Sequence, residues 1–458
     1  MKRFICIVLA VAIVLSIGTI ATASNENFSF SLSAANGKLT DRAYTTYESL
    51  EKITVSATGP IKSLYIVFWD APTAFSVNGK PYEAAYLHQL VEVNEGEQIE
   101  ITFNSKTKVS DIFAFGENLP DWVQKWTEPV EKADILLCPT HSDDDQLYFA
   151  GLLPYYAGEK GYSVQVAYLV DHSLNPQRRH ELLNGLWEAG VTAYPVINPI
   201  ADLYSESAEE AIAKLESYGV SEDDILDFQI TLLRRFKPQV VVTHDFGGEY
   251  GHGMHKLNAK TMARAIELSG ESKASPQTAE QYGVWSVKKM YVHLYEENQV
   301  VLDLDTPLSR FGGKTAYEVS CAAFEHHKSQ HSYSFLSWLR GKNNEYTKAT
   351  QITKYSPTQY GLYYTAVGED KLKNDLFENL TDYKTIAAKE KETAEAEERA
   401  RLEAEEKERL EEALQKQKEK NKIIRVVSAA VLVAVGAFLL VRLVVKKNKK
   451  KKLNESTD

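Results

Sequence analysis

The sequence predicts an α/β protein in which a parallel sheet carries helices on both faces and follows a smaller all-β domain. From residue 133 onward, short apolar runs alternate with helical segments, which is typical of a parallel sheet. Residues 24–131 instead contain alternating apolar and polar runs with turn signals such as Asn78-Gly79, which is typical of antiparallel strands. A chain of 458 residues is also too long for one typical domain and suits two domains with appendages.

The N-terminus has the pattern of a secretory signal peptide. Lys2 and Arg3 precede an apolar run over residues 4–20, and the Ala-Thr-Ala triplet at 21–23 supplies a small-residue cleavage site. We therefore expect residues 1–23 to be a signal peptide. An uncleaved anchor helix is the alternative, because the apolar run is long.

Residues 24–131 are predicted to form a small β-sandwich accessory domain. Its aromatic residues allow two interpretations, a sugar-stacking face or core and interdomain packing, and packing is favoured because aromatic content alone does not indicate carbohydrate binding. The residues concerned are Trp69, Tyr82, Trp122 and Trp126.

Residues 132–383 are predicted to form the α/β domain. Strands are expected at 133–138, 163–170, 239–243 and 288–295. Helices are expected at 146–153, where Pro154 would end the helix, and at 177–189, 208–218, 223–236 and near 255–268. Residues 331–383 are rich in tyrosine without a clear period and are assigned to this domain. Cys138 and Cys321 lie in apolar surroundings, so we expect buried free thiols rather than a bridge.

The C-terminal part is predicted to be a stalk, a membrane anchor and a tail. Residues 384–422 are dominated by Ala, Glu, Lys, Arg and Leu without Gly or Pro, which favours a solvated helix. Residues 423–445 would span about 34 Å as a helix, enough to cross the hydrocarbon core. The lysine-rich segment 446–458 is expected to stay in the cytoplasm, which places the body outside the cell. The formal charge of −11 excludes nucleic acid as an electrostatic partner.

Polar clusters follow two of the predicted strands. One cluster runs from Pro139 to Asp145, and the other runs from His244 to His255. In α/β folds ligands bind beyond the carboxyl ends of strands, and three His or Asp ligands with an open position suit a catalytic zinc. Taken separately, an Asp run can cap a helix and a His-x-x-His pair can be structural. Their shared position at one edge of the sheet favours a metal site.

These clusters resemble the motifs of the PIG-L/LmbE-like zinc-dependent N-acetylglucosaminyl de-N-acetylases. His141-Ser142-Asp143-Asp144-Asp145 is similar to the family's His-Pro-Asp-Asp-Glu signature. Arg178-Arg179-His180-Glu181 resembles its Arg-x-x-Glu element, and Gly251-His252-Gly253-Met254-His255 resembles its Gly-His-x-x-His element. The resemblance covers about residues 132–340 in the family's order. It implies a Rossmann-like fold and removal of acetyl groups from amino sugars.

The resemblance also implies a set of functional residues. The implied zinc ligands are His141, Asp144 and His255; the implied general base is Asp143; His252 would face the reacting carbonyl as a cationic donor; and Arg178 and Tyr250 would contact the substrate. Hydrolysis would use a zinc-activated water whose proton Asp143 accepts.

The chain departs from the family pattern at three positions. Ser142 replaces the usual proline and Asp145 the usual glutamate, and neither position supplies a ligand. Met254 stands where some members have an acid that orients the neighbouring histidine, a role that Glu249 or Asp245 is available to take. His172 and His244 also lie near strand ends and are expected to orient other groups rather than bind metal.

The leading hypothesis is therefore a membrane-anchored extracytoplasmic zinc deacetylase acting on N-acetylglucosamine-type units of a cell-wall or extracellular glycan. The first alternative is a non-catalytic surface glycan-binding protein with a degenerate hydrolase domain, which the complete set of motif residues disfavours. A second is cleavage of another N-acyl group, from a thiol-linked sugar or an amide, which the predicted external location disfavours for cytosolic substrates.

Overall fold

The computed structural model describes residues 21–22, 28–33, 37–94 and 96–454. The chain divides into two compact units that meet after Lys384. The predicted signal peptide lies outside the described residues except for Ala21–Thr22, which form the two-residue strand β1 paired with β2 (Ser29–Leu32). Cleavage of a signal peptide therefore stays a prediction.

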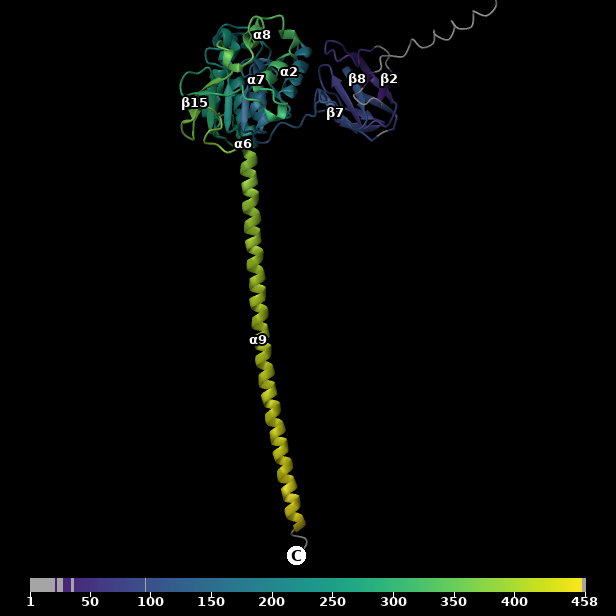
Figure 1. The fold of residues 1–458 in the computed structure, drawn as a ribbon, viewed down its shortest axis with the longest axis vertical. Helices are drawn as coiled ribbons and strands as arrows, with labels where there is room; N and C mark the ends of the chain where they lie inside the picture. Colours follow the sequence, from purple (N-terminus) through teal and green to yellow (C-terminus); the bar gives the residue numbers. More distant parts are fainter. Residues whose placement is uncertain (1–20, 23–27, 34–36, 95, 455–458) are drawn as a thin grey trace, which may run out of the picture. The chain divides into compact units, whose positions relative to one another are not determined.

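The first part of the first unit consists of antiparallel strands, as the alternating pattern predicts (Figure 1). The 18-residue strand β8 (Gln98–Phe115) joins them, because it pairs with β3 (Glu48–Ala57), β4 (Ser63–Phe68) and β5 (Phe75–Val77), while β7 (His88–Glu92) pairs with β4. Hydrogen bonds thus connect the described strands of this part into one sheet. The two-sheet arrangement of a sandwich stays a prediction.

The Asn78-Gly79 turn forms where the sequence predicts it. It joins β5 to β6 (Lys80–Tyr82) through a two-residue loop, with φ of 48° at Asn78 and 80° at Gly79. Asn and Gly tolerate this left-handed conformation, which matches the twist of the two strands.

A seven-stranded mixed sheet forms the α/β part, in the order β11-β10-β9-β12-β13-β15-β14. The first five strands in that order are parallel, and they follow the doubly wound arrangement in which the first strand of the sheet lies in its middle. Their bounds are β9 (Ile135–Cys138), β10 (Val164–Tyr168), β11 (Val196–Ile197), β12 (Val240–Thr243) and β13 (Lys289–His293).

Helices cover both faces of this sheet, as the alternation of strands and helices predicts. The burial of β9 shows the two faces: Ile135 and Leu137 pack into one hydrophobic cluster, and Leu136 and Cys138 pack into another. Helices α2 (Pro176–Glu188) and α7 (Ala316–Phe324) contribute to the first cluster. Helices α4 (Glu222–Phe236) and α5 (Gly253–Leu268) contribute to the second, and α3 (Ala208–Glu216) packs against α5.

Two features of the α/β part differ from the prediction. The sheet is not wholly parallel, because β15 (Gln359–Thr365) runs antiparallel to β13 and β14 (Gln299–Val301) runs antiparallel to β15. The helix expected at 146–153 is instead the short α1 (Asp144–Leu147), and a π-helical turn follows at Pro154–Glu159. Gly151, with φ of 89°, interrupts the helix, and Pro154 begins the next turn rather than ending the first.

The remaining helices of the first unit are short. They are α6 (Pro276–Tyr282), α8 (Phe335–Arg340) and the 3₁₀ turns Glu249–Gly251, Ser309–Phe311, Lys328–Gln330 and Ala349–Gln351.

The second unit is formed by one continuous helix, α9 (Tyr383–Asn454). It is the one helix among the described residues that is long and apolar enough to cross a membrane. Its side chains are exposed from residue 387 to 451, including the apolar stretch 423–445, and a lipid environment would cover that stretch. Ion pairs four residues apart, such as Lys391 with Glu395 and Lys416 with Glu412, support the charged half of the helix.

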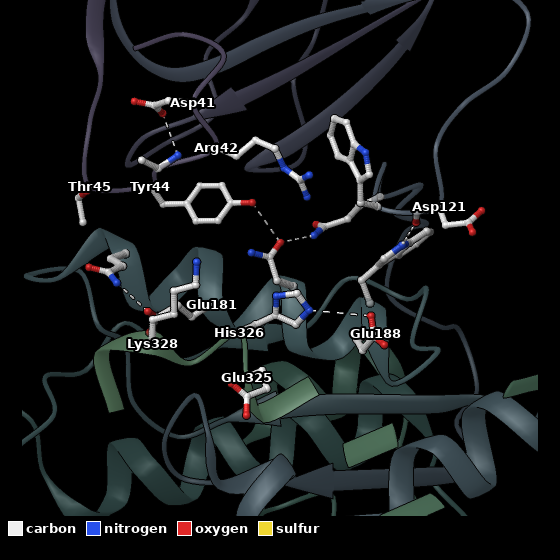
Figure 2. Close-up of a pocket in the computed structure, with 16 residues that line it drawn as sticks. Asp41, Arg42, Tyr44, Thr45, Asp121, Glu181, Glu188, Glu325, His326 and Lys328 are labelled. Carbon is white, nitrogen blue, oxygen red and sulfur yellow. Dashed lines mark hydrogen bonds and ion pairs between the residues drawn. The ribbon is translucent and has the colours of Figure 1, made fainter. Parts of the chain in front are cut away.

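The all-β part packs against α2 of the α/β part. His88 Nε2 lies 2.7 Å from His180 Nδ1, and Gln124 donates a hydrogen bond to Asn184 at 2.6 Å. A cavity of about 1080 Å³ lies beside this contact (Figure 2), and its lining includes Trp122 and Trp187. None of the seven motif residues predicted to be functional lines this cavity.

Most of the aromatic residues for which the sequence allows either sugar stacking or packing are packed against other side chains. Trp126 is buried edge-on against Trp187 and Tyr194, and Tyr82 stacks on Phe75. These contacts agree with the favoured interpretation, and carbohydrate binding by this domain stays an untested alternative. Both described cysteines, Cys138 and Cys321, are free and buried, as expected.

Asp111 makes the stability of the all-β part pH-dependent. Burial raises the pKa of its carboxyl to about 7, although the backbone N–H of Arg42 donates to Oδ1 at 3.0 Å. The unfolded chain loses this proton near pH 4, whereas the folded chain keeps it up to about pH 7, so stability falls as pH rises through that range. We predict that Asp111→Asn raises the free energy of unfolding at pH 8 relative to pH 5 by about 2–3 kcal/mol.

Urea unfolding of the detergent-solubilised chain at both pH values measures this change. Asp121→Asn, an exposed aspartate of the same part of the chain, is the control. An unchanged difference between pH 5 and pH 8 in Asp111→Asn would show that the buried carboxyl is not the cause.

Candidate metal centre

The register of two neighbouring strands brings the two polar clusters together. β9 and β12 are parallel neighbours with Cys138 opposite Thr243, so the segments that follow them leave the sheet at the same level. This is the point where the strand order reverses, where doubly wound sheets bind ligands. The first segment runs into α1, and the second reaches α5 with His252 at its N-cap.

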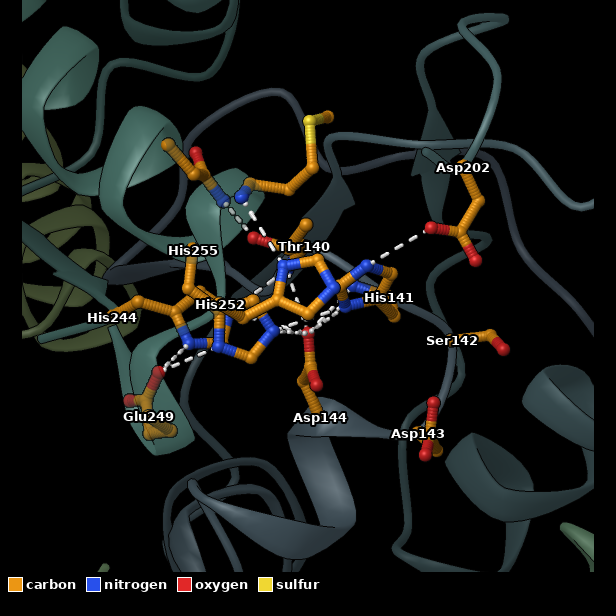
Figure 3. A network of polar contacts seen from close by, with 12 residues as sticks. Thr140, His141, Ser142, Asp143, Asp144, Asp202, His244, Glu249, His252 and His255 are labelled. Carbon is orange, nitrogen blue, oxygen red and sulfur yellow. Dashed lines mark hydrogen bonds and ion pairs between the residues drawn. The ribbon is translucent and has the colours of Figure 1, made fainter. Parts of the chain in front are cut away.

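Three buried side chains converge at this edge (Figure 3). His141 Nδ1 lies 3.0 Å from His255 Nε2 and 3.2 Å from Asp144 Oδ2, and His255 Nε2 lies 3.4 Å from Asp144 Oδ2. The structure therefore brings together the three residues that the resemblance implies as metal ligands.

Neighbouring carboxylates set the tautomers of the two histidines. Glu249 Oε2 accepts a hydrogen bond from His255 Nδ1 at 2.8 Å, which leaves the lone pair of His255 on Nε2. Asp202 Oδ1 lies 3.2 Å from His141 Nε2, which leaves the lone pair of His141 on Nδ1. Two imidazole lone pairs and a carboxylate oxygen thus face one point, and this donor set fits a divalent metal such as zinc.

The electrostatic field at this point favours a positive charge. Burial lowers the pKa of His141, but the carboxylates of Asp202 and Asp144 outweigh burial and raise this pKa to about 10. Asp144 Oδ2 accepts the backbone N–H groups of Thr140 and His141, at 3.1 and 2.6 Å, which fixes the carboxylate. A metal cation would replace the proton that these carboxylates otherwise attract.

His244 stands close to the same point but has no free nitrogen. Its Nδ1 donates to Glu249 Oε2 at 2.7 Å, and its Nε2 accepts the backbone N–H of Thr140 at 2.9 Å. Asp144, His244 and His255 also form a group whose ligand atoms lie close together. Both nitrogens of His244 thus have partners within the protein, which favours support of the loop over metal binding.

His252 is placed beside the three converging residues. Its ring centroid lies 4.7 Å from that of His141 and 4.8 Å from that of His255. Its Nδ1 accepts the backbone N–H of Met254 at 3.1 Å, so the neutral ring carries its proton on Nε2. Burial and the rings of His141 and His255 lower the pKa of His252 to about 2. The geometry therefore favours a neutral donor, in contrast to the cationic donor that the resemblance implied.

A close backbone contact positions the loop that carries His252. A Cβ atom on Gly253 would lie 2.3 Å from both Ser207 O and Ser205 Oγ, and Gly253 N–H donates to Ser205 O at 2.7 Å. A glycine is required here, since any side chain would push α5 away from the 205–207 segment.

Asp143 and Arg178 form a buried ion pair next to this cluster. Arg178 Nη2 donates to Asp143 Oδ1 at 2.6 Å, and Arg178 Nη1 lies 3.2 Å from His172 Nδ1. Burial raises the pKa of Asp143, which Arg178 partly opposes and Asp144 reinforces. A carboxyl with a raised pKa suits proton transfer near neutral pH.

Tyr250 covers the cluster from the loop before α5. Its ring centroid lies 5.4 Å from that of His252 and 5.6 Å from that of His255, and its backbone has a φ of 47°. A positive φ in a tyrosine is unusual, and such strain concentrates at functional sites.

The sequence indicates only some of the residues that orient the three candidate ligands. Glu249 was considered as an orienting acid for His252, but it orients His255, His244 and His293 instead. His293 was missed, although it ends β13 and the rule of carboxyl strand ends would have found it. Asp202 was also missed, because the two-residue strand β11 before it gives no periodic signal.

The fold and the site define an α/β protein with a candidate three-ligand metal centre at the switch point of its sheet. Sequence comparison then finds similarity over 198 residues to 1D-myo-inositol 2-acetamido-2-deoxy-alpha-D-glucopyranoside deacetylase of Streptomyces scabiei, at 26% identity, covering 38% of this chain and 60% of the relative. The deacetylase of the same name from Streptomyces avermitilis is 25% identical over 210 residues, covering 40% of this chain and 70% of the relative. No family model matches the chain.

This similarity to proteins named as deacetylases of an acetamido sugar agrees with the resemblance of the three motifs to those of the PIG-L/LmbE-like deacetylases. It spans 60% of the length of the S. scabiei relative. Among solved structures, N,N′-diacetylchitobiose deacetylase from Pyrococcus horikoshii aligns at 17% identity with a TM-score of 0.36, covering 51% of this chain and 84% of that one.

Glu249 offers a test of the metal centre. The Glu249 carboxylate accepts hydrogen bonds from three imidazole N–H groups. The NH₂ group of a glutamine side chain would place a donor against at least one of these N–H donors. We predict that Glu249→Gln weakens Zn²⁺ or Co²⁺ binding by about 10- to 100-fold, as loss of such supporting groups does at other metal sites. Competition titration against a chelator measures the affinity.

Glu216→Gln, at an exposed glutamate on α3, is the matched control and is expected to keep the wild-type affinity. Equal metal affinity in Glu249→Gln and wild type would contradict the assignment of His255 as a ligand that Glu249 orients.

Proposed function

We propose that this protein is a membrane-anchored, zinc-dependent de-N-acetylase that removes acetyl groups from N-acetylglucosamine-type amino sugars. The observation that carries the proposal is the convergence of His141 Nδ1, Asp144 Oδ2 and His255 Nε2 within 3.4 Å of one another, with Asp143 and His252 beside them. The curated relatives, which carry the name of a deacetylase acting on an acetamido sugar, support the reaction class.

The metal would be held by His141, Asp144 and His255. A bound zinc ion there supplies a Lewis acid and lowers the pKa of water to about 7.

Asp143 acts as the general base in this proposal. Its raised pKa lets it accept the proton of the attacking water and later deliver a proton to the departing amine. Arg178 holds the carboxylate in place through the 2.6 Å hydrogen bond, and its remaining donors are available for substrate hydroxyls. The overall change is hydrolysis of the amide by one water, giving acetate and a free amino sugar.

His252 stabilises the charge that develops on the carbonyl oxygen. Because Met254 N–H occupies Nδ1, the proton on Nε2 is available as a donor toward the substrate. A neutral donor needs no proton from solution, so this role does not depend on acid conditions. Tyr250, whose ring packs on His252, closes the site beside it.

The location of the reaction is part of the proposal. The apolar stretch of α9 supports membrane anchoring, and the lysines at 446–452 support a cytoplasmic tail with the body outside the cell. The substrate would then be a cell-wall or extracellular glycan, and the partners would be this glycan and the membrane.

Acetate release tests the activity. We predict that the purified zinc-loaded protein releases acetate from N-acetylglucosamine oligomers, and that a chelator abolishes the release. Asp143→Asn is expected to lower kcat by about 10²- to 10⁴-fold, the range associated with loss of a general base, while the bound zinc stays equimolar by elemental analysis.

Asp303→Asn, a control outside the site, should keep wild-type activity. Full activity in Asp143→Asn would remove the base from the mechanism. Bound zinc without any acetate release would instead favour the glycan-binding alternative.

Protease accessibility tests the orientation. We predict that protease added to intact cells digests the body, because the lysine-rich tail holds the C-terminus inside. An epitope fused after Asp458 should be protected until the cells are lysed. Digestion of the epitope in intact cells, with a protected body, would place the enzyme in the cytoplasm.

A further inference from the structure

A line of aromatic rings crosses the candidate site. The ring of Tyr204 lies 5.3 Å from that of His252, and the ring of Tyr250 lies 5.4 Å from that of His252. The line continues through Phe335, whose ring lies 6.3 Å from that of Tyr250, to Tyr333, which stacks on Phe335 at 5.3 Å. The proposed oxyanion donor His252 therefore has aromatic neighbours that lead away from it to two ends.

The two ends of this line are exposed. The side chains of Tyr204 and Tyr333 are 62% and 59% exposed, whereas His252 is buried. Tyr204 comes from the segment between β11 and α3, and Tyr333 comes from the segment before α8, so separate parts of the chain supply them. Exposed apolar surface that is continuous with a functional site is typical of a ligand-binding groove.

Tyrosine rings suit a carbohydrate ligand. A pyranose has an apolar face of C–H groups and a rim of hydroxyls, and a tyrosine has an apolar ring and one polar tip. A tyrosine side chain also supplies a large contact area at a low cost in conformational entropy, because it has two rotatable bonds.

We propose that the substrate is a chain of linked amino sugars, with at least one sugar on each side of the unit that is deacetylated. Tyr204 and Tyr333 stack on the flanking sugars, while the acetamido group of the central unit lies against His252 and Asp143. This inference rests on the proposed function and narrows its substrate class.

The experiment compares a pentamer with a monomer, using the full-length protein in detergent with zinc bound. The probes are β-1,4-linked chitopentaose and N-acetylglucosamine, and the readout is kcat and KM for acetate release. We expect kcat/KM for the pentamer to exceed that for the monomer by at least about tenfold. We expect Tyr204→Ala and Tyr333→Ala each to lower the pentamer value by about three- to tenfold through KM, and to lower the monomer value by less.

Two controls separate stacking from general effects. Tyr204→Phe and Tyr333→Phe keep the rings and should keep the preference for the pentamer. Tyr218→Ala removes a tyrosine that is 69% exposed just after α3, and it should change nothing. Equal kcat/KM for pentamer and monomer in the wild type overturns the inference, and so does an equal loss on both substrates in the alanine variants.

Failure of the proposed activity can be distinguished from failure of this inference. If neither probe releases acetate, the proposed function fails, and calorimetric titration of chitopentaose then decides the inference alone. A Kd that rises at least threefold in Tyr204→Ala and Tyr333→Ala, but not in Tyr218→Ala, supports an extended glycan site. Absence of pentamer binding, or an unchanged Kd in both variants, overturns it.

Discussion

One buried carboxylate, that of Glu249, organises the candidate site. It accepts hydrogen bonds from His244, His255 and His293, which come from the end of β12, the first turn of α5 and the end of β13. Burial alone would raise the pKa of Glu249, but the three histidines hold it well below its usual range, so the group stays ionised. An unpaired charge at this depth would be strongly destabilising, so the three rings and the carboxylate require one another. The direction of the His255 lone pair follows from this arrangement.

The same dependence explains why local sequence patterns indicate the three candidate ligands but not the residues that support them. His141, Asp144 and His255 were identified because they occur in motifs and follow strong apolar strands, and the register of β9 with β12 then brings them within 3.4 Å. Asp202 and His293 reach the site only through strand order and chain folding, which no local period records. The sequence does not predict the antiparallel strand β15 for a related reason. This segment is rich in tyrosine, its apolar and polar residues do not alternate cleanly, and no helix of the sheet follows it.

The position of the proton on each imidazole ring decides whether His252 and His255 can donate or coordinate, and the sequence alone does not give that position. A His-x-x-His element is compatible with two metal ligands, with one ligand and one donor, or with two structural histidines. The backbone N–H of Met254 and the carboxylate of Glu249 resolve this choice, because they fix the proton on Nε2 of His252 and on Nδ1 of His255. His252 thereby presents an N–H at Nε2, and His255 presents a lone pair at Nε2. The replacement of an orienting acid by Met254 is consistent with this division, since a neutral donor needs no acid beside it.

The accessory domain bears on the site through helix α2. Three consecutive residues of α2 face different partners: Arg178 binds Asp143, Arg179 donates to the backbone carbonyl of Asp70, and His180 contacts both His88 and the carbonyl of Trp69. Burial lowers the pKa of both His88 and His180, so their contact is a hydrogen bond between neutral rings rather than a repulsive ion pair. A shift of α2 toward or away from the metal centre would break these contacts together with the Arg178–Asp143 pair. The all-β part therefore holds the helix whose Arg178 contacts Asp143, the proposed general base.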